Sequence, residues 1–520
     1  MNAAQFRKHG KEVIDAIADY YENLDNISPV PNVKSGYLYK LVPDEAPENP
    51  ESFETVKADI ETKIMPGMTH WQSGNFFAWY PSSSSFPSII GDMYSSMFSI
   101  VGFSWISSLA ATELETVVMD WLGKLLGLDK RFLAINEDGT ENKGGGAIQT
   151  TASGAMVTMI ATARDRFLES LTMQQAIGED DVARLRPRFV AYFSDQTHSS
   201  GEKAANVIGC KARILPSNDD FSLTKEVLMA AVEQDKKSGL IPFFVCGTFG
   251  TTNTAAIDDI PGIADVAADN NMWLHIDAAY AGGALVCPEF RPLASGIERA
   301  DSISINAHKW LLTNFDCSAL WVADSTHLVN SMGIRREYLP RVKGDTSFVK
   351  DYRDWQIPLG RRFRALKLWF VMRMYGASGI RAHIREHVIQ AKWLEERLLA
   401  DGRFEIMAPV VFGLVVFRIK PTALSEHDRA DKDVINKANI DLAELINNEG
   451  RVFILSTMLK GKVALRATIG AVHGSLKNVE VLLTVLQKHF AAAINHELVI
   501  KDANDNDSSL PCIPSFFTDV

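Results

Sequence analysis

Short apolar runs recur through the middle of this chain and are separated by segments with helical spacing. The runs of strand length are residues 189–193, 212–215, 243–248, 273–276, 302–306 and 319–322. Parallel strands need long crossover connections, so strands that alternate with helices predict a largely parallel, doubly wound sheet covered by helices. We therefore expect an α/β fold whose functional loops gather at one edge of the sheet.

The same patterns divide the chain into four parts. We predict a helical arm at 1–85, a large α/β domain at 86–385, a small α+β domain at 386–495 and a flexible acidic tail at 496–520. Within the small domain, the spacing of apolar residues predicts helices at 389–399, 439–447 and 479–493 and strands at 404–407, 413–419 and 463–467.

The composition is that of an ordinary globular protein, with 520 residues, 46% of them hydrophobic and 22% charged. A net charge of -11, with no local cluster of Lys and Arg, argues against nucleic acid or an anionic membrane as partner. Five widely spaced cysteines favour reduced thiols in the cytoplasm over a disulfide framework. The N-terminus lacks the apolar core of a secretory signal, and no apolar window is long enough to span a membrane.

Two of the apolar runs are followed by residues of opposite charge. Asp277 follows the run at 273–276, and Lys309 follows the run at 302–306. A pyridoxal phosphate site needs such a pair, because a carboxylate keeps the ring nitrogen protonated and an amine bonds to the aldehyde. Either residue alone is better explained as a helix cap or a surface lysine. Together, after two strand-like runs, they predict a pyridoxal phosphate enzyme.

A glycine-rich turn precedes a candidate phosphate site. After Gly144–Gly146, the segment Thr150–Gly154 leads into an apolar helix, whose N-terminal N–H groups and hydroxyls can hold a dianion. The segment alone could be a flexible turn with an ordinary N-cap, but Lys309 downstream favours phosphate binding. Neither nucleotide-binding glycine motif, G-x-G-x-x-G or G-x-x-x-x-G-K-[ST], is present here.

Blocks along most of the chain resemble the group II pyridoxal-phosphate decarboxylases, and specifically the aromatic L-amino acid decarboxylases. The segment Asn306–Trp310 resembles their lysine motif. Further blocks with similar order and spacing are 68–71, 76–78, 102–105, 113–122, 144–146, 194–200, 250–252 and 355–364. The resemblance implies fold type I, with a mainly parallel seven-stranded sheet. It also implies a homodimer with active sites at the subunit interface, in which the N-terminal arm reaches the second subunit.

The resemblance also implies roles for individual residues. Lys309 would bond to the cofactor, Asp277 would pair with the ring nitrogen, and His198 would stack on the ring near the substrate carboxylate. A lone histidine such as His198 is more often structural. Tyr338, in a polar segment expected to be a mobile loop, matches the tyrosine proposed to return a proton to the substrate carbon. Further expected cofactor contacts are Thr151, Ala152, Ser153, Thr252, Ala279, Asn306 and His308.

An aromatic wall is expected around the substrate side chain. Positions that line the family's pocket are Trp71, Trp79, Tyr80, Pro81, Ser82, Val101 and Phe103. The family often has Tyr-Phe-Pro-Thr at 79–82, so Trp79 would narrow the pocket and Ser82 would weaken a contact to a ring hydroxyl. Gly360 leaves space where phenol- or imidazole-preferring relatives often have serine. These features predict broad use of tryptophan, phenylalanine, tyrosine and dihydroxyphenylalanine, without ranking them.

Decarboxylation to an amine is favoured over two alternatives. Relatives that form aldehydes typically have phenylalanine at the position of Tyr338 or asparagine at that of His198, and this chain retains both groups. An aromatic acetaldehyde synthase therefore stays the second candidate. A catalytically silent scaffold is the third, disfavoured because all four catalytic positions are intact.

Three features depart from the family or resist interpretation. Gly201 stands where the family usually has a larger residue, and residues 421–439 look like a charged insertion, expected to be a solvated surface loop. The acidic tail at 501–507 superficially suggests a calcium loop. It lacks the glycine and glutamate of that motif, so no metal site is predicted.

Overall fold

The computed structural model describes residues 1–175, 179–334 and 348–495. These form two compact units, one made of Ser82–Val388 and the other of Met1–Pro81 with the described residues from Ile389 onward. The predicted arm as far as Pro81 and the predicted small domain from Ile389 thus belong to one unit. Tyr338, the greater part of the expected loop and the acidic tail lie outside the described residues.

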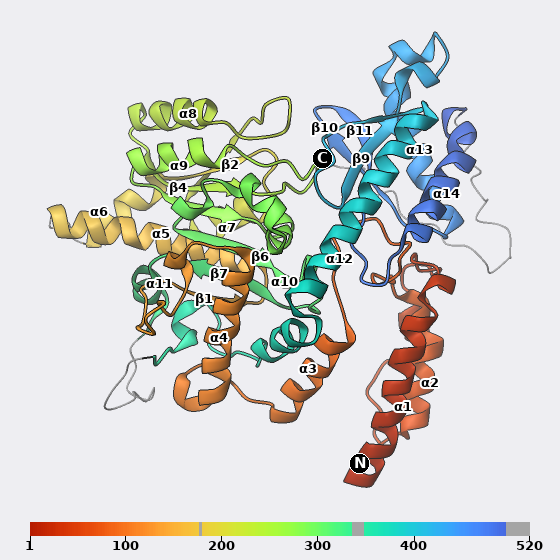
Figure 1. Ribbon diagram of the computed structural model, residues 1–520, viewed down its shortest axis with the longest axis horizontal. Coiled ribbons are helices and arrows are strands. Elements are labelled where there is room, and N and C mark those ends of the chain that lie inside the picture. Colours follow the sequence, from red (N-terminus) through yellow and green to blue (C-terminus); the bar gives the residue numbers. More distant parts are fainter. Residues whose placement is uncertain (176–178, 335–347, 496–520) are drawn as a thin grey trace. The chain divides into compact units, whose positions relative to one another are not determined.

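The unit Ser82–Val388 is built on a seven-stranded sheet with the strand order β1-β7-β6-β5-β4-β2-β3 (Figure 1). In this sheet β7 is antiparallel to both neighbours and the other pairings are parallel. The strands are β1 (Gly145–Gln149), β2 (Phe189–Ser194), β3 (Lys211–Leu215), β4 (Ile241–Thr248), β5 (Trp273–Asp277), β6 (Ser302–Asn306) and β7 (Ser318–Val322). The predicted fold class is confirmed.

The burial of these strands explains their composition. The residues of β2, β5, β6 and β7 are all buried. The sequences of β2 and β7 are accordingly almost continuously apolar, whereas β6 alternates polar residues with Ile although both of its faces are buried. The edge strand β3 is largely accessible and carries Lys211 and Arg213. The six predicted runs all form strands. The sequence prediction missed β1, because Gly-Gly-Ala-Ile-Gln contains a single residue with high strand propensity.

Helices pack around this sheet. Because α5 contacts α7 and α8 contacts α9, the crossover helices form neighbouring pairs. Asp259 caps α9 by accepting a hydrogen bond from the Gly262 N–H. The helices of this unit are α3 (Phe86–Phe98), α4 (Leu109–Leu126), α5 (Ala152–Gln175), α6 (Glu179–Leu185), α7 (Ser200–Ile208), α8 (Lys225–Lys237), α9 (Ile260–Asp269), α10 (Ala307–Trp310) and α11 (Ser325–Met332).

The long helix α12 (Ala365–Asp401) runs from this unit into the other and is interrupted at Gly376, where φ is +63°. The second unit contains α1 (Ala3–Glu22) and α2 (Phe53–Asp59). Its antiparallel sheet has the order β10-β11-β9-β8. The remaining elements are β8 (Phe404–Ile406), β9 (Leu414–Ile419), α13 (Lys432–Glu449), β10 (Leu455–Leu459), β11 (Lys462–Thr468) and α14 (Leu476–Ile494).

The charged insertion is only partly a loop. Residues 432–439 belong to α13, which begins where the Asp431 side chain accepts hydrogen bonds from two backbone N–H groups. Ile435, Ala438 and Asn439 are buried in the unit's core. The expectation of a solvated loop was therefore wrong for this part, since an N-cap and apolar residues at helical spacing outweigh the local charge.

The structure also bears on the cysteine and membrane expectations. Cys210, Cys246, Cys287 and Cys317 are buried and form no disulfide among the described residues. In the part of the chain that the structure covers, no helix has the length and apolar character needed to cross a membrane.

Candidate active site

Three of the predicted catalytic residues lie at or just beyond the carboxyl ends of parallel strands, which share one edge of the sheet. Asp277 is the last residue of β5, and Lys309 lies in α10, three residues beyond β6. His198 lies between β2 and α7. Because β5 and β6 pair directly, with Asp277 opposite Ser304, the carboxylate and the lysine leave the sheet side by side.

Asp277 is held by the backbone that follows it, and the strand that carries it is bonded to β6 through His275. It is 6% exposed, and its Oδ1 accepts a hydrogen bond of 3.0 Å from the Ala279 N–H. Two residues earlier, His275 lies 2.8 Å from the Ser302 hydroxyl and 3.2 Å from the Ser304 hydroxyl. Burial lowers the pKa of His275 to about 4, so the ring is neutral and serves as a hydrogen-bonding strut between β5 and β6.

His198 responds to both charges of the predicted site. Burial lowers its pKa, the carboxylate of Asp277 acts in the opposite direction, and the ammonium of Lys309 acts with burial. Its Nδ1 accepts a hydrogen bond of 3.1 Å from the Ser200 N–H. A neutral ring therefore carries its proton on Nε2. His198 therefore lies close enough to Asp277 and Lys309 for both charges to affect its pKa.

The predicted phosphate contacts lie at two turns. Thr151, Ala152 and Ser153 open α5 directly after β1, and the Thr151 hydroxyl accepts a hydrogen bond of 3.1 Å from the Gly154 N–H. At the second turn, Nδ1 of His308 accepts a hydrogen bond of 2.9 Å from the Cys317 N–H, which leaves the proton on Nε2. Burial and the nearby Lys309 lower the pKa of His308 to about 4.

These residues fit the demands of pyridoxal phosphate. Asn306, the N-cap residue of α10, is buried, and the Nδ2–H₂ group of its amide is a donor from which phosphate oxygens could accept hydrogen bonds. A helix N-terminus, a neutral histidine donor and this amide suit a phosphate dianion. Asp277 suits the ring nitrogen and Lys309 the aldehyde. Thr252 and Ala279, after β4 and β5, follow strands that end at the same edge.

The predicted substrate residues fall into both units. Trp71, Trp79, Tyr80 and Pro81 belong to the unit with the N-terminal arm. Trp71 and Trp79 stack with ring centroids 5.1 Å apart and an angle of 18° between the rings. Their exposed fractions are 36% and 40%, whereas Tyr80 is buried, with the Arg466 guanidinium 5.4 Å from its ring centre.

Ser82, Val101, Phe103 and Gly360 belong to the unit with the large sheet. A Cβ on Gly360 would lie 3.8 Å from a methyl group of Val101, so the structure brings these two predicted residues together. The next residue, Arg361, accepts on its carbonyl the N–H of Gly102 at 3.0 Å. Tyr338 lies outside the described residues, so its place relative to these groups is left as a prediction.

Sequence reasoning missed residues that contact the turn bearing Lys309. The hydroxyls of Ser83, Ser85 and Ser88 bond to this turn, and each serine is at most 2% exposed. Trp310 donates its indole N–H to Nδ1 of His387 at 2.9 Å. The run of four serines at 82–85 was a visible signal, but such a run ordinarily reads as a helix cap.

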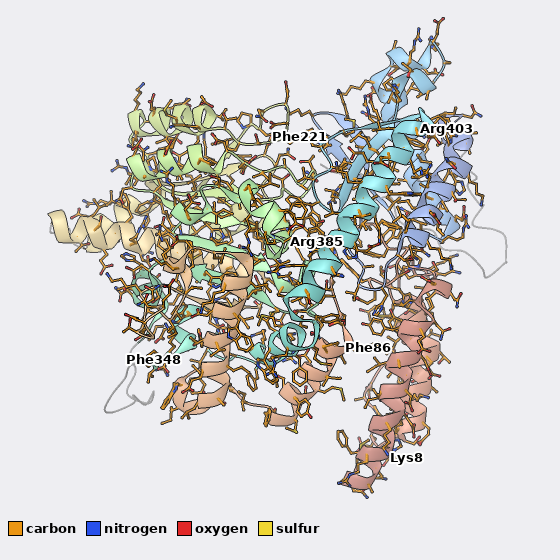
Figure 2. The ribbon with its side chains drawn as sticks, viewed as in Figure 1. Lys8, Phe86, Phe221, Phe348, Arg385 and Arg403 are labelled. Carbon is orange, nitrogen blue, oxygen red and sulfur yellow. The ribbon has the colours of Figure 1, made fainter. Side chains whose placement is uncertain are left out.

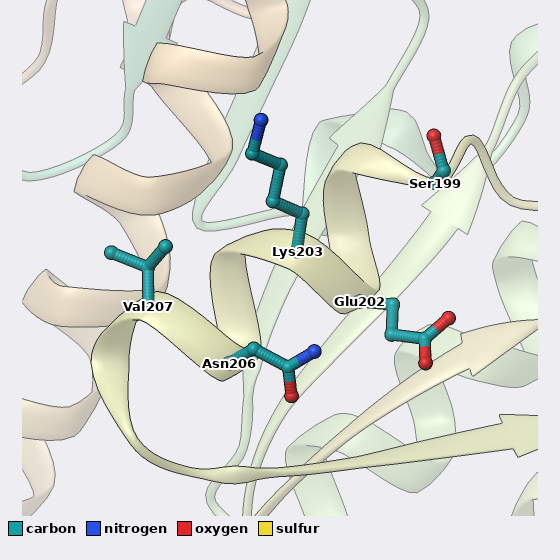
Figure 3. Close-up of a pocket in the computed structure, with 5 residues that line it drawn as sticks. All are labelled: Ser199, Glu202, Lys203, Asn206 and Val207. Carbon is teal, nitrogen blue, oxygen red and sulfur yellow. The ribbon is translucent and has the colours of Figure 1, made fainter.

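Two further features of α7 lie near His198. A Cβ on Gly201 would come within 2.6 Å of the Phe193 ring, so close packing of α7 on β2 explains the small residue there. A shallow cavity of about 450 Å³ opens on the same helix and is lined by residues that carry none of the predicted chemistry (Figure 3). They are Ser199, Glu202, Lys203, Asn206 and Val207.

Comparison with known proteins gives a consistent result. The family described as "Pyridoxal-dependent decarboxylase conserved domain" matches residues 35–420. Phenylacetaldehyde synthase of Arabidopsis thaliana is 42% identical over 94% of this chain and 96% of its own length. Tryptophan decarboxylase 2 of Oryza sativa is 44% identical over 91% of both chains. Aromatic-L-amino-acid decarboxylase of Cavia porcellus is 45% identical over 90% of this chain and 94% of its own.

Solved structures agree over nearly the whole chain. The structure of Oryza sativa TDC with PLP and tryptamine superposes with a TM-score of 0.90 at 37% identity, covering 95% of this chain and 99% of that one. Catharanthus roseus tryptophan decarboxylase in complex with L-tryptophan gives a TM-score of 0.85 at 38% identity, covering 94% and 99%.

Proposed function

Because the chain belongs to the pyridoxal-dependent decarboxylase family, we propose that it removes carbon dioxide from aromatic L-amino acids and releases arylalkylamines. Its cofactor is pyridoxal 5'-phosphate. The observation that carries the proposal is the convergence of Asp277, Lys309 and His198 at one edge of the sheet, where both charges act on the histidine.

Each residue has a separate task in this proposal. The bound cofactor supplies an electron sink for the bond that breaks at the substrate carboxylate. Asp277 keeps the ring nitrogen protonated, and the start of α5 with His308 and Asn306 holds the phosphate. Lys309 would supply the amine that bonds to the cofactor. His198 would offer its Nε2–H as a donor to the substrate carboxylate.

Aromatic substrates are supported by the stacked pair Trp71 and Trp79, whose exposed faces suit another aromatic ring. Two of the similar structures named above contain, according to their names, tryptamine and L-tryptophan. We propose that tryptophan is among the substrates, with phenylalanine, tyrosine and dihydroxyphenylalanine as further candidates. Gly360 supports the indole, because it leaves room beside Val101.

The second candidate is an aromatic acetaldehyde synthase. It is favoured by the 42% identity to a phenylacetaldehyde synthase, which is comparable to the identity to decarboxylases. Retention of His198 favours the amine product. Tyr338 is proposed from the sequence alone as the group that returns a proton to the substrate carbon.

We further propose that two copies of the chain form the working enzyme. Helix α3 presents an apolar stripe, of which Phe86 is labelled in Figure 2, and each of its members is more than a third exposed. The stripe consists of Phe86, Ile90, Met93, Tyr94 and Met97. Such a face on a helix calls for a partner surface. Light scattering should give twice the chain mass of 57.5 kDa, and Met93→Glu with Met97→Glu should give the monomer.

A product assay tests the proposed function. Purified protein loaded with pyridoxal 5'-phosphate is incubated with tryptophan, tyrosine, phenylalanine, dihydroxyphenylalanine and histidine, and amine, aldehyde and peroxide are measured together. Amine with little peroxide supports the decarboxylase. Aldehyde with stoichiometric peroxide supports the synthase. His198→Asn should shift a decarboxylase toward aldehyde, and an unchanged product ratio would remove His198 from the proposed control of the outcome.

A further inference from the structure

We propose that Ser83, Ser85 and Ser88, called here the serine clamp, are positioning residues for Lys309. They act on the backbone of the turn that carries the lysine and do not touch the substrate. The proposal rests on the assignment of Lys309 as the amine that bonds the cofactor. It concerns how that amine is aimed.

The turn that carries Lys309 cannot satisfy its own backbone. Helix α10 has four residues and ends at Trp310, and the N–H of its C-cap Leu311 bonds back to the Ala307 carbonyl. The carbonyls of His308 and Lys309 would be left without helical donors. Ser83 supplies both donors, its N–H to His308 at 2.8 Å and its hydroxyl to Lys309 at 2.5 Å.

Ser85 stands at the N-cap of α3, where a serine hydroxyl ordinarily accepts a hydrogen bond from the first turn. It makes no such bond, and its hydroxyl instead donates to the Leu312 carbonyl at 2.6 Å. Leu312 has φ +59°, a left-handed conformation that leucine rarely adopts. The helix therefore gives up its cap, and the hydroxyl holds a strained residue three positions after Lys309.

Ser88 fixes the far end of the same turn. Its hydroxyl donates to the side-chain carbonyl of Asn314 and accepts the Asn314 N–H at 2.8 Å. The Asn314 amide in turn donates to Asp92 Oδ2 at 2.7 Å. Asn314 is thus bound to two residues of α3 that lie one turn apart on the same helical face.

Helix α3 is itself held firmly enough to serve as a support. A Cβ on Gly91 would lie 2.5 Å from the Cα of Lys367, so this glycine lets α3 approach the backbone of α12. The Lys367 ammonium, fully buried, lies 3.4 Å from Asp92 Oδ2. The serine clamp consequently connects the lysine turn to a packed helix pair, and the long side chain of Lys309 starts from a fixed backbone.

The test compares Ser83→Ala and Ser85→Ala with the matched control Ser84→Ala, a half-buried serine of the same run. In the holoenzyme we expect each clamp variant to lower kcat about 10- to 100-fold, with KM nearly unchanged. The pH midpoint of the absorbance of the Lys309-bound cofactor should shift, because the amine is aimed differently. Ser84→Ala should keep the wild-type kcat and midpoint.

Ser85→Cys separates hydrogen bonding from space filling, because a thiol occupies the volume but donates weakly. The proposal expects it to behave as Ser85→Ala does. It is overturned if Ser85→Cys restores wild-type kcat and midpoint. It is also overturned if both alanine variants keep the wild-type midpoint and kcat per bound cofactor while losing only thermal stability.

Failure of the proposed function would look different. The absorbance midpoint depends on the bond between Lys309 and the cofactor and requires no turnover. A shifted midpoint in the clamp variants, without amine from any aromatic amino acid, would refute the substrate class and leave the clamp standing. If Ser83→Ala does not fold, Ser85→Ala decides the proposal by the same two readouts, since it leaves both bonds of Ser83 in place.

Discussion

The lysine turn and the Trp71–Trp79 pair show opposite strategies within one chain. Around Lys309, the carbonyls of three residues have serine-derived donors, and His308 is bonded to the Cys317 backbone. The tryptophan pair stacks with itself but leaves more than a third of each side chain exposed. The difference teaches that hydrogen bonds within one unit fix the turn that carries Lys309. The two tryptophans proposed for substrate choice are not fixed in this way and keep exposed faces.

The largest expected effect concerns Lys309 itself. Lys309→Ala should lower amine formation by at least about 10⁴-fold and abolish the absorbance of lysine-bound cofactor, since it removes the amine proposed to bond to the aldehyde. The half-buried side chain makes little contribution to the core, so the melting temperature of the apoprotein should be nearly unchanged. The exposed Lys237→Ala is the control and should match the wild type in both measurements. Substantial turnover by Lys309→Ala would contradict the site assignment.

Asp277→Asn should have the next largest effect. The amide can still accept the Ala279 N–H, but it carries no charge to hold a proton on the ring nitrogen. We expect kcat to fall about 10²- to 10³-fold, a loss of about 3 to 4 kcal/mol of transition-state stabilisation. Steady-state kinetics at saturating cofactor measure it. Asp277→Glu, which keeps the charge, should be less impaired, and equal losses in both variants would point to geometry in place of charge.

The pH dependence of stability gives a third prediction. The folded protein lowers the pKa of His308 from 6.5 to about 4. Between these values the unfolded chain binds a proton that the folded chain does not, so stability falls as pH falls from 6.5 to 4. This residue should contribute up to about 3 kcal/mol to that loss.

Denaturant unfolding of the apoprotein at several pH values measures the effect. His308→Gln should flatten the slope relative to the wild type, although a slope from His275, whose pKa is also lowered to about 4, should remain. Bound cofactor should weaken the dependence on His308, since a phosphate dianion favours the protonated ring. A wild-type slope in His308→Gln would show that the ring is not buried as described.

The sequence predicted those parts of the fold in which each residue acts through its own strand. Runs rich in apolar residues marked β2–β7, and the charged residues at the end of β5 and after β6 marked Asp277 and Lys309. The weakly apolar β1 could not be recognised, because its burial comes from neighbours that are distant in sequence. The serine clamp was hidden for the same reason. Ser85 reads as a helix cap, and its bond to Leu312 spans 227 positions that no local pattern reports.

The smallest expected effect concerns the residues proposed for substrate choice. If Trp79 and Ser82 tune the substrate pocket, Trp79→Phe with Ser82→Thr should change the ratio of kcat/KM for tryptophan to that for tyrosine by about tenfold or less, because pocket contacts of this kind are worth about 1 to 2 kcal/mol. Tyrosine should gain, since a threonine hydroxyl and a narrower ring suit a phenol. The absorbance midpoint of lysine-bound cofactor should stay at the wild-type value if these two residues act on substrate choice alone. A shifted midpoint would show that substrate-pocket residues also affect the turn that carries Lys309. An unchanged ratio of kcat/KM would show that these two residues do not control substrate choice.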